Sequence, residues 1–383
     1  MKSIRSPKDN NVIKVHTESV ELDGPFLVKE DSEFLRNAFA SSHINFLLGA
    51  GFCCGLLPTL ACREEWIAQA CANGERKHEA LLQYEFFRNV VCPMEGLHPN
   101  EEMVEFAKQL KRLLAARGTI SIPRKASLFT TNYDAILEDA FEIAGVSYND
   151  GFEGRISPIF ATRSFGHVQY VQSLSLEYSA QVPTINIIKL HGSVTWSKEN
   201  PQAITYCEAA KLIPRLIETH GSLLSQEELD KIKTAVSEPF IDSDIEVLNG
   251  IVDSKSPEWS DEAESFLEDY YSTLQIVNPN KSKFEETVMG LTYYELMRLF
   301  ANELDRNNAL LVSFGFSFAD EHILEIVKRA LENPQLILLV CCHTPDDLEW
   351  YQNKLNDYDN VKYVVPTEQF NLADLCALLK EVR

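Results

Sequence analysis

The sequence has little positive charge and no long apolar run. Its 383 residues include 35 lysines and arginines against 57 aspartates and glutamates, which gives a formal net charge of −22. Because phosphate binding needs clustered basic side chains, this balance argues against direct binding of nucleic acid. No apolar stretch is long enough to span a bilayer, and the opening MKSIRSPKDNNVIKVHTESV lacks the apolar centre of a secretory signal. We therefore expect no membrane contact and a cytoplasmic location.

Cysteine pairs of the kind that bind zinc are also missing. Among the nine cysteines, no two have the spacing C-x₂-C, which argues against a zinc ribbon. Their odd number and their positions in apolar segments indicate reduced, buried thiols. We expect no metal ion.

Apolar runs bounded by turn residues predict the strands of a buried parallel sheet. These runs lie at residues 43–51, 126–132, 184–194, 308–316, 335–342 and 361–365. Helical apolar spacing occurs at residues 30–41, 60–118, 285–305, 322–333 and 371–382. Buried strands that alternate with helices predict an α/β fold with a doubly wound, Rossmann-like parallel sheet.

The same pattern predicts the domain organisation. An N-terminal arm (1–29) precedes a single catalytic domain (30–383), which carries helical insertions at about 60–125 and 197–285. The acidic residues are concentrated in the second insertion, at 225–271. We favour a solvated, partly mobile insertion over an acidic docking surface for this stretch.

Glycines follow the first predicted strand, in LLGAGFCCGLLPT. Ligands of open α/β sheets bind at the carboxyl ends of the strands, and glycine there lets the backbone approach a pyrophosphate. Gly49 and Gly51 have this position, but Gly55 comes one residue too late for G-x-G-x-x-G. A tight strand-to-helix turn is the alternative interpretation.

Polar residues end the second predicted strand, in ASLFTTNYD. A helix is expected to start near Ala135, so Thr131, Asn132 or Asp134 could simply cap it. Capping explains one polar side chain at this place, whereas Thr130, Thr131, Asn132 and Asp134 are four polar residues within five positions. A binding site is the second interpretation.

Two further strands end in candidate site residues. His191 closes the strand in IIKLHGSV, and an imidazole at this edge can act as a general base. Gly315 and Ser317 close the strand in LLVSFGFSFADEHI, and Asp320 is placed to cap the next helix. The Ser317 hydroxyl could bind a ribose or belong to that cap.

Together the segments GAG, TTNYD, KLHGS and GFSFADEHI resemble the sirtuin-like (silent information regulator) family, within it the bacterial anti-phage branch that hydrolyses NAD. The resemblance covers about residue 43 to the C-terminus, apart from the two insertions. It implies NAD as substrate and the following site residues: Gly49, Ala50 and Gly51 along the diphosphate, Thr131, Asn132 and Asp134 around the nicotinamide and its ribose, His191 as catalytic histidine, and Gly315 and Ser317 near the adenosine ribose. The strand at 335–343 would border the adenine.

The activity that this resemblance implies is NAD glycohydrolysis, the cleavage of NAD to nicotinamide and ADP-ribose, as a defence effector that depletes NAD. Deacylating sirtuins carry a four-cysteine zinc module after the His-Gly pair, and only Cys207 follows here before residue 341. The absence of this zinc module favours water, rather than an acyl-lysine, as the acceptor in NAD cleavage. Asn132 and His191 would act on a ribose hydroxyl or water, and Asp134 would hold Asn132 or the nicotinamide amide.

The resemblance also implies a homo-oligomer and a complex with a HerA-type ring ATPase. Two other functions stay open from the sequence. One is an NAD-dependent protein deacylase, and the other is a non-catalytic subunit that binds NAD or ADP-ribose and gates a partner ATPase.

Overall fold

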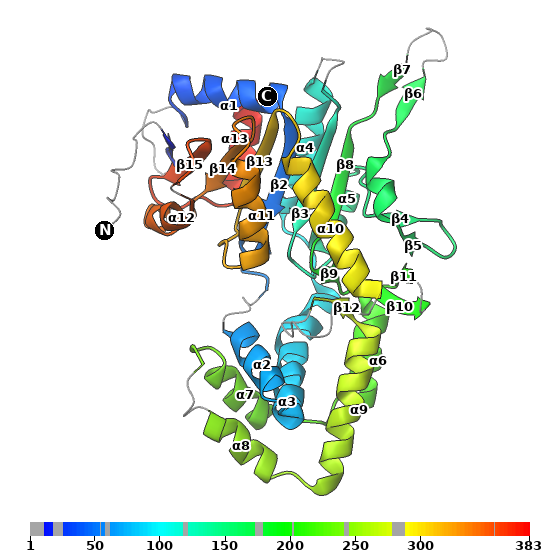
Figure 1. The fold of residues 1–383 in the computed structure, drawn as a ribbon. Coiled ribbons are helices and arrows are strands. Elements are labelled where there is room, and N and C mark those ends of the chain that lie inside the picture. The colour runs from blue at the N-terminus through cyan, green and yellow to red at the C-terminus, as the bar shows by residue number, and fades with distance from the viewer. Residues whose placement is uncertain are drawn as a thin grey trace.

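A seven-stranded sheet, in which every pair of neighbouring strands is parallel, forms the centre of the protein (Figure 1). The computed structural model describes residues 11–17, 26–53, 55–57, 62–117, 122–172, 179–200, 203–240, 245–277, 288–355 and 357–383. The strand order is β1 (Val12–Val15), β15 (Val361–Pro366), β14 (Ile337–Cys341), β13 (Ala309–Phe314), β2 (His43–Leu48), β3 (Lys125–Thr130) and β8 (Thr184–Lys189). Six of these strands lie where the apolar runs predict them.

Helices cover both faces of the sheet, because successive strand residues point to opposite faces and both sets are apolar. In β2, Phe46 packs on one face and Leu47 on the other. The first face is covered by α1 (Lys29–Ser41), α4 (Glu101–Ala116), α5 (Ile136–Ile143) and α13 (Leu372–Glu381). The second is covered by α10 (Val288–Leu304), α11 (Glu321–Leu331) and α12 (Asp347–Leu355). The predicted doubly wound α/β fold is confirmed.

A helical lobe lies beyond the carboxyl ends of the strands (Figure 1). We use this name for α2 (Arg63–Ala72), α3 (Arg76–Phe86), the π-helical segment Phe87–Val91, the 3₁₀-helical segment Cys92–Gly96, α6 (Ala209–His220), α7 (Gln226–Ala235), α8 (Ile245–Asp253) and α9 (Pro257–Thr273). Its core is separate from the two sheet cores and is rich in aromatic residues, among them Trp66, Tyr84 and Phe266.

The acidic stretch at 225–271 forms part of this packed lobe, whereas the sequence favoured a solvated segment. Leu229, Ile232 and Phe266 of that stretch are buried against α2 and α3, and its charges lie mainly on the exposed side. The aromatic and branched residues occur at helical spacing between the acids, so a charged surface and a packed core coexist. The other predicted insertion is divided, since α4 covers the sheet while α2 and α3 belong to the lobe.

Several elements have no counterpart in the sequence pattern. In the N-terminal arm, β1 adds an edge strand beside β15. Short strands follow α5 and precede the lobe: β4 (Phe152–Glu153), β5 (Ile159–Phe160), β6 (Tyr170–Gln172), β7 (Ser179–Gln181), β10 (Trp196–Asn200) and β11 (Ala203–Tyr206). A further short strand, β9 (Gly192–Ser193), lies inside the run 184–194, where one strand was predicted. After the lobe, β12 (Gln275–Ile276) pairs with β9. Two to five residues give too little periodicity to be recognised.

Parts of the predicted arm and insertions lie outside the described residues, including 1–10, 18–25, 118–121 and 278–287. Within the described part, no helix combines the length and the apolar character that crossing a membrane requires.

Candidate active site

The topology of the sheet places a crevice between β2 and β13. The strands β3 and β8, which follow β2 in the chain, lie on one side of it, and β13, β14 and β15 lie on the other side. Such a reversal of strand order is where α/β proteins bind ligands. Gly51 donates its N–H to the carbonyl of Gly315 at 2.9 Å, so the turns after the two strands touch at this point.

Only glycine fits this contact. A Cβ on Gly51 would lie 2.5 Å from the Gly315 Cα, and Gly315 has a φ of +62°. The two backbones therefore meet without side chains between them, which leaves an open surface of peptide groups above. Gly49 takes part in the same junction, since its N–H donates to the Phe314 carbonyl at 3.1 Å.

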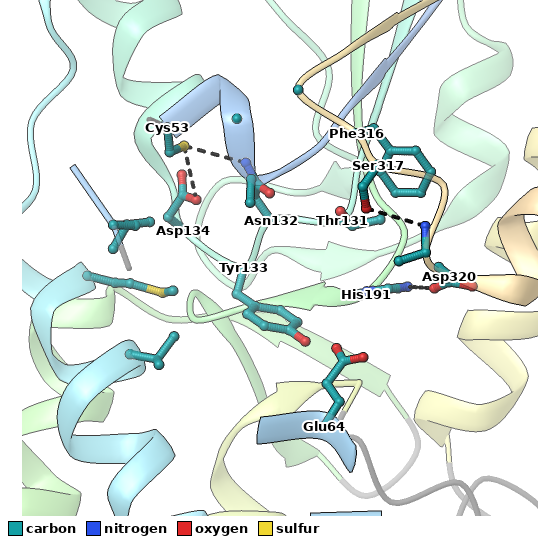
Figure 2. Close-up of a pocket in the computed structure, with 17 residues that line it drawn as sticks. Cys53, Glu64, Thr131, Asn132, Tyr133, Asp134, His191, Phe316, Ser317 and Asp320 are labelled. Carbon is teal, nitrogen blue, oxygen red and sulfur yellow. Dashed lines mark hydrogen bonds and ion pairs between the residues drawn. The ribbon is translucent and has the colours of Figure 1, made fainter. Parts of the chain in front are cut away.

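A cavity of about 420 Å³ lies beside this junction, between the sheet and the helical lobe. Figure 2 shows that side chains from both regions point into it. From the sheet side it is lined by Ala50, Gly51, Cys53, Thr131, Asn132, Tyr133, Asp134, His191, Gly315, Phe316, Ser317, Ala319 and Asp320. The structure thus brings the predicted site residues together around one cavity, with Gly49 directly behind Asn132.

Asn132 is fixed through its amide nitrogen, which donates to the Gly49 carbonyl at 3.0 Å. Its backbone N–H donates to the Thr130 hydroxyl at 3.1 Å. Because these bonds use the donors, the amide oxygen of Asn132 can accept a hydrogen bond from a hydroxyl group in the cavity. This explains why an asparagine suits the end of β3.

Asp134 is buried, with 2% of its surface exposed. Its carboxylate accepts from the Ile136 N–H at 3.0 Å and from the Cys53 thiol at 3.5 Å. Cys53 also accepts from the Asn132 amide at 3.4 Å, so it joins the two predicted site residues. Burial, together with the Asp134 carboxylate, raises the pKa of the Cys53 thiol and keeps it protonated.

Beneath Asp134 lies a buried ammonium group that the sequence pattern did not single out. Lys189, at the end of β8, donates to the Asp134 carbonyl and forms an ion pair with Glu138 at 3.2 Å. Burial alone lowers the pKa of Lys189, but the Glu138 and Asp134 carboxylates outweigh it and hold the pKa above its usual value. A charged lysine thus anchors the start of α5 to β8.

His191 lies on the opposite wall, held by both its backbone and its ring. Its carbonyl accepts from the Val277 N–H at 2.7 Å. Gly192 has a φ of +79°, and a Cβ there would lie 2.1 Å from the Gln275 carbonyl, so glycine is required for β9 to pair with β12. This pairing fixes the strand end that carries the imidazole.

The ring of His191 pairs with Asp320, with 3.1 Å between Nε2 and Oδ2 (Figure 2). Asp320 also caps α11, because its other oxygen accepts from the Ile323 N–H at 3.1 Å. Burial raises the pKa of the Asp320 carboxyl, but the hydrogen bond and charge of His191 outweigh it and hold the pKa below its usual value. The sequence indicated the cap but not the pairing, since the start of α11 meets the end of β8 only in the fold.

Ser317 follows β13 at the exposed side of the cavity. Its hydroxyl accepts from the Ala319 N–H at 3.3 Å, so it belongs to the turn before α11. Ser317 also lines a second cavity of about 620 Å³, together with Gly51 and Gly315. This second cavity extends towards Cys341 and His343, at the end of β14. The glycine junction therefore lies between two adjoining cavities.

The comparisons with known proteins find a family match in one segment. Residues 126–213 match the family model of the SIR2-like domain. This segment contains Thr131, Asn132, Asp134 and His191, and the match implies NAD as the ligand. No curated protein matches the chain significantly.

Solved structures of Sir2 proteins are similar at a distance. A complex of Sir2 with a p53 peptide and NAD⁺ has 15% identity and a TM-score of 0.42, with 91% of this chain and 96% of that chain covered. A structure of Sir2Tm bound to a propionylated peptide has 15% identity and a TM-score of 0.43, with 92% and 98% covered. Among the described residues, no group of three or more histidine, cysteine, aspartate or glutamate side chains could hold a metal ion.

Proposed function

We propose that the protein is an NAD glycohydrolase, which cleaves the bond between nicotinamide and ribose and releases ADP-ribose. The observation that carries this proposal is that Asn132 and His191, from the ends of two sheet strands, line one cavity beside the Gly51–Gly315 junction. The SIR2-like match over residues 126–213 supports NAD as the ligand.

The two cavities suit the two ends of a dinucleotide. We place the nicotinamide riboside in the cavity with Asn132 and His191, and the diphosphate over the exposed peptide groups of Gly51 and Gly315. The adenosine then occupies the second cavity, near His343, beside the strand predicted to border the adenine. Ser317 lines both cavities, in keeping with a position near the adenosine ribose.

The reaction needs an environment that stabilises positive charge on the ribose. When the bond from C1′ to the nicotinamide nitrogen breaks, its electron pair leaves with nicotinamide, and charge develops on C1′ and the ring oxygen. A water oxygen then bonds to C1′ and its proton passes to His191. Among the described residues that line the cavity are three carboxylates, of Glu64, Asp134 and Asp320, and no lysine or arginine. This distribution favours a cationic group.

The pairing with Asp320 gives His191 a defined role. When Nε2–H donates to Asp320, the lone pair of the neutral imidazole is on Nδ1, which can accept a proton from water or a ribose hydroxyl. Asn132 orients that hydroxyl through its amide oxygen. Asp320 acts through His191 and is a positioning residue.

Water is the proposed acceptor rather than an acyl-lysine. After His191 and Gly192 the chain continues through β9–β11 directly into α6 of the helical lobe. The lobe occupies the part of the chain where the deacylating sirtuins of the resemblance carry their zinc module. The defence role, the homo-oligomer and the HerA-type ATPase partner rest on the resemblance alone and belong to the same proposal.

The experiment is incubation of the purified protein with NAD while nicotinamide and ADP-ribose are followed by chromatography. We expect His191→Ala and Asn132→Ala each to lower turnover by about 10²-fold or more, since general base catalysis alone contributes about 10²–10⁴-fold. His98→Ala is the matched control, because His98 is on the surface with 83% of its side chain exposed. Far-UV circular dichroism verifies that each variant is folded.

Full turnover in both site variants would contradict the assignment of the site. Nicotinamide release that requires an acetylated peptide would identify a deacylase instead. NAD binding without release, alone and with a HerA-type ATPase, would identify a binding subunit.

A further inference from the structure

The helical lobe contributes one charged side chain to the candidate site. Glu64 is in the first turn of α2 and lines the same cavity as Asn132 and His191. Figure 2 shows its carboxylate on the lobe side, directed towards the ring of Tyr133. The ring centroids of Tyr133 and His191 are 6.4 Å apart, so the imidazole also lies near this aromatic ring.

The start of α2 is held firmly in place. Arg63 donates to the Glu85 carboxylate through Nε at 2.9 Å and through a terminal nitrogen at 2.7 Å, and both side chains are buried. One turn later, the Trp66 indole donates to the Glu238 carbonyl at 3.1 Å. A bidentate buried pair on one side and a buried indole on the other fix the turn that carries Glu64.

The three carboxylates of the cavity differ in their surroundings. Asp134 accepts from Ile136 and Cys53, and Asp320 from His191 and Ile323. Both belong to the sheet side, whereas Glu64 comes from the lobe and is exposed to solvent. Burial raises the pKa of Tyr133, and the negative charges of Glu64 and Asp320 raise it further.

We propose that Glu64 is a further catalytic residue, which contacts the nicotinamide ribose and stabilises the positive charge that develops on it. This inference rests on the proposed NAD cleavage, and it makes the helical lobe part of the catalytic machinery. The alternative is that Glu64 only stabilises the start of α2, where the helix dipole favours an acidic residue. Glu65 lies in the same turn without lining the cavity, so it provides a matched control.

The first test compares Glu64→Gln with Glu65→Gln. We expect Glu64→Gln to lower kcat for nicotinamide release by about 10²-fold, the order found when one transition-state-stabilising group is removed. Glu65→Gln should keep kcat within about twofold, and both variants should unfold at similar urea concentrations. If both variants had the same kcat as the unchanged protein, the proposed role of Glu64 would be overturned. The proposed NAD glycohydrolase activity would not be affected by this result.

The second test measures binding and does not depend on turnover. In the His191→Ala background, affinities for NAD⁺ and for NADH, whose nicotinamide ring is uncharged, are measured by calorimetry. We expect NAD⁺ to bind more tightly, and Glu64→Gln to reduce this preference by about three- to tenfold while Glu65→Gln preserves it. An unchanged preference would overturn the inference even if no NAD cleavage were found. Failure to bind either nucleotide would overturn both the inference and the proposed function.

Discussion

The sheet and the helical lobe line the same cavity, but they contribute different chemistry to it. The sheet provides backbone glycines and polar side chains at strand ends, such as Asn132 and His191. The lobe provides apolar side chains, Val90 and Met94, and the carboxylate of Glu64. Hydrogen bonds between strands fix the sheet residues, whereas the lobe residues depend on how a separate aromatic core packs. A site of this kind can be disabled from either side, by different physical means.

The largest effect should come from the core of the lobe. Trp66 is 1% exposed, and its ring packs edge-on against Phe240 at 5.0 Å. We expect Trp66→Ala to lower the free energy of unfolding by about 3–5 kcal/mol and to reduce turnover per folded molecule, because α2 would no longer hold Glu64 in place. Urea unfolding and NAD turnover at low temperature measure the two quantities.

The control for this prediction is Leu378→Ala, in α13 on the sheet side. Leu378 is fully buried and does not line the cavity, so its loss should cost about 2–5 kcal/mol without reducing turnover of the folded fraction. If both variants lost turnover equally, the lobe would have no special part in the site.

A smaller effect is expected at the glycine junction of the sheet. Gly315 and Gly145 share a φ of +62°, but a Cβ on Gly315 would lie 2.6 Å from Gly51, while nothing lies within 4 Å of one on Gly145. Gly145→Ala should therefore lower the free energy of unfolding by about 1–2 kcal/mol, because alanine disfavours this backbone conformation. Gly315→Ala should lower the free energy of unfolding by about 1–3 kcal/mol more than Gly145→Ala, because the added methyl group overlaps Gly51. Urea unfolding measures both values.

The comparison of these two glycines also tests how closely the turns after β2 and β13 approach each other. Equal destabilisation by the two substitutions would mean that the junction is looser than the 2.9 Å bond between Gly51 and Gly315 indicates. Weaker NAD binding in Gly315→Ala alone would support the diphosphate position.

The sheet side could be predicted well from the sequence because each feature is local. An apolar run such as ASLF predicts a buried strand, and the residues after it must lie at the strand's carboxyl end. This rule predicts the positions of Asn132 and His191 at strand ends. The Asp320–His191 pairing could not be predicted, because it joins residues 129 positions apart (320 − 191). Its only local signal was the helix cap.

The lobe was harder to predict for a different reason. Glu64 stands beside Glu65 in a helix start, where acidic residues are common, so the sequence does not show which one faces a cavity. The acidic stretch at 225–271 suggested a solvated segment, because its charges outnumber the residues that build its core. Which face of each helix is buried depends on partners such as Trp66, more than 150 residues away in the chain.

The smallest predicted effect distinguishes the His191–Asp320 pair from a simple helix cap. Asparagine caps helices about as well as aspartate, so Asp320→Asn should preserve the start of α11 and remove only the charge beside His191. We expect a loss of about 1 kcal/mol in the free energy of unfolding near neutral pH. The proton-accepting role of His191 should weaken as well, which would lower kcat for nicotinamide release.

The sign of the pH dependence follows from the lowered pKa of Asp320, to which both His191 and His322 contribute. A carboxyl group whose pKa is lower in the folded state contributes stability above its unfolded pKa of about 3.9, and this contribution is lost as the pH falls through the folded value. The stability difference between the unchanged protein and Asp320→Asn should therefore be present above pH of about 4 and disappear at lower pH. A difference that persisted into strong acid would mean that Asp320 stabilises the fold without its charge, rather than through a hydrogen bond from His191 to the carboxylate.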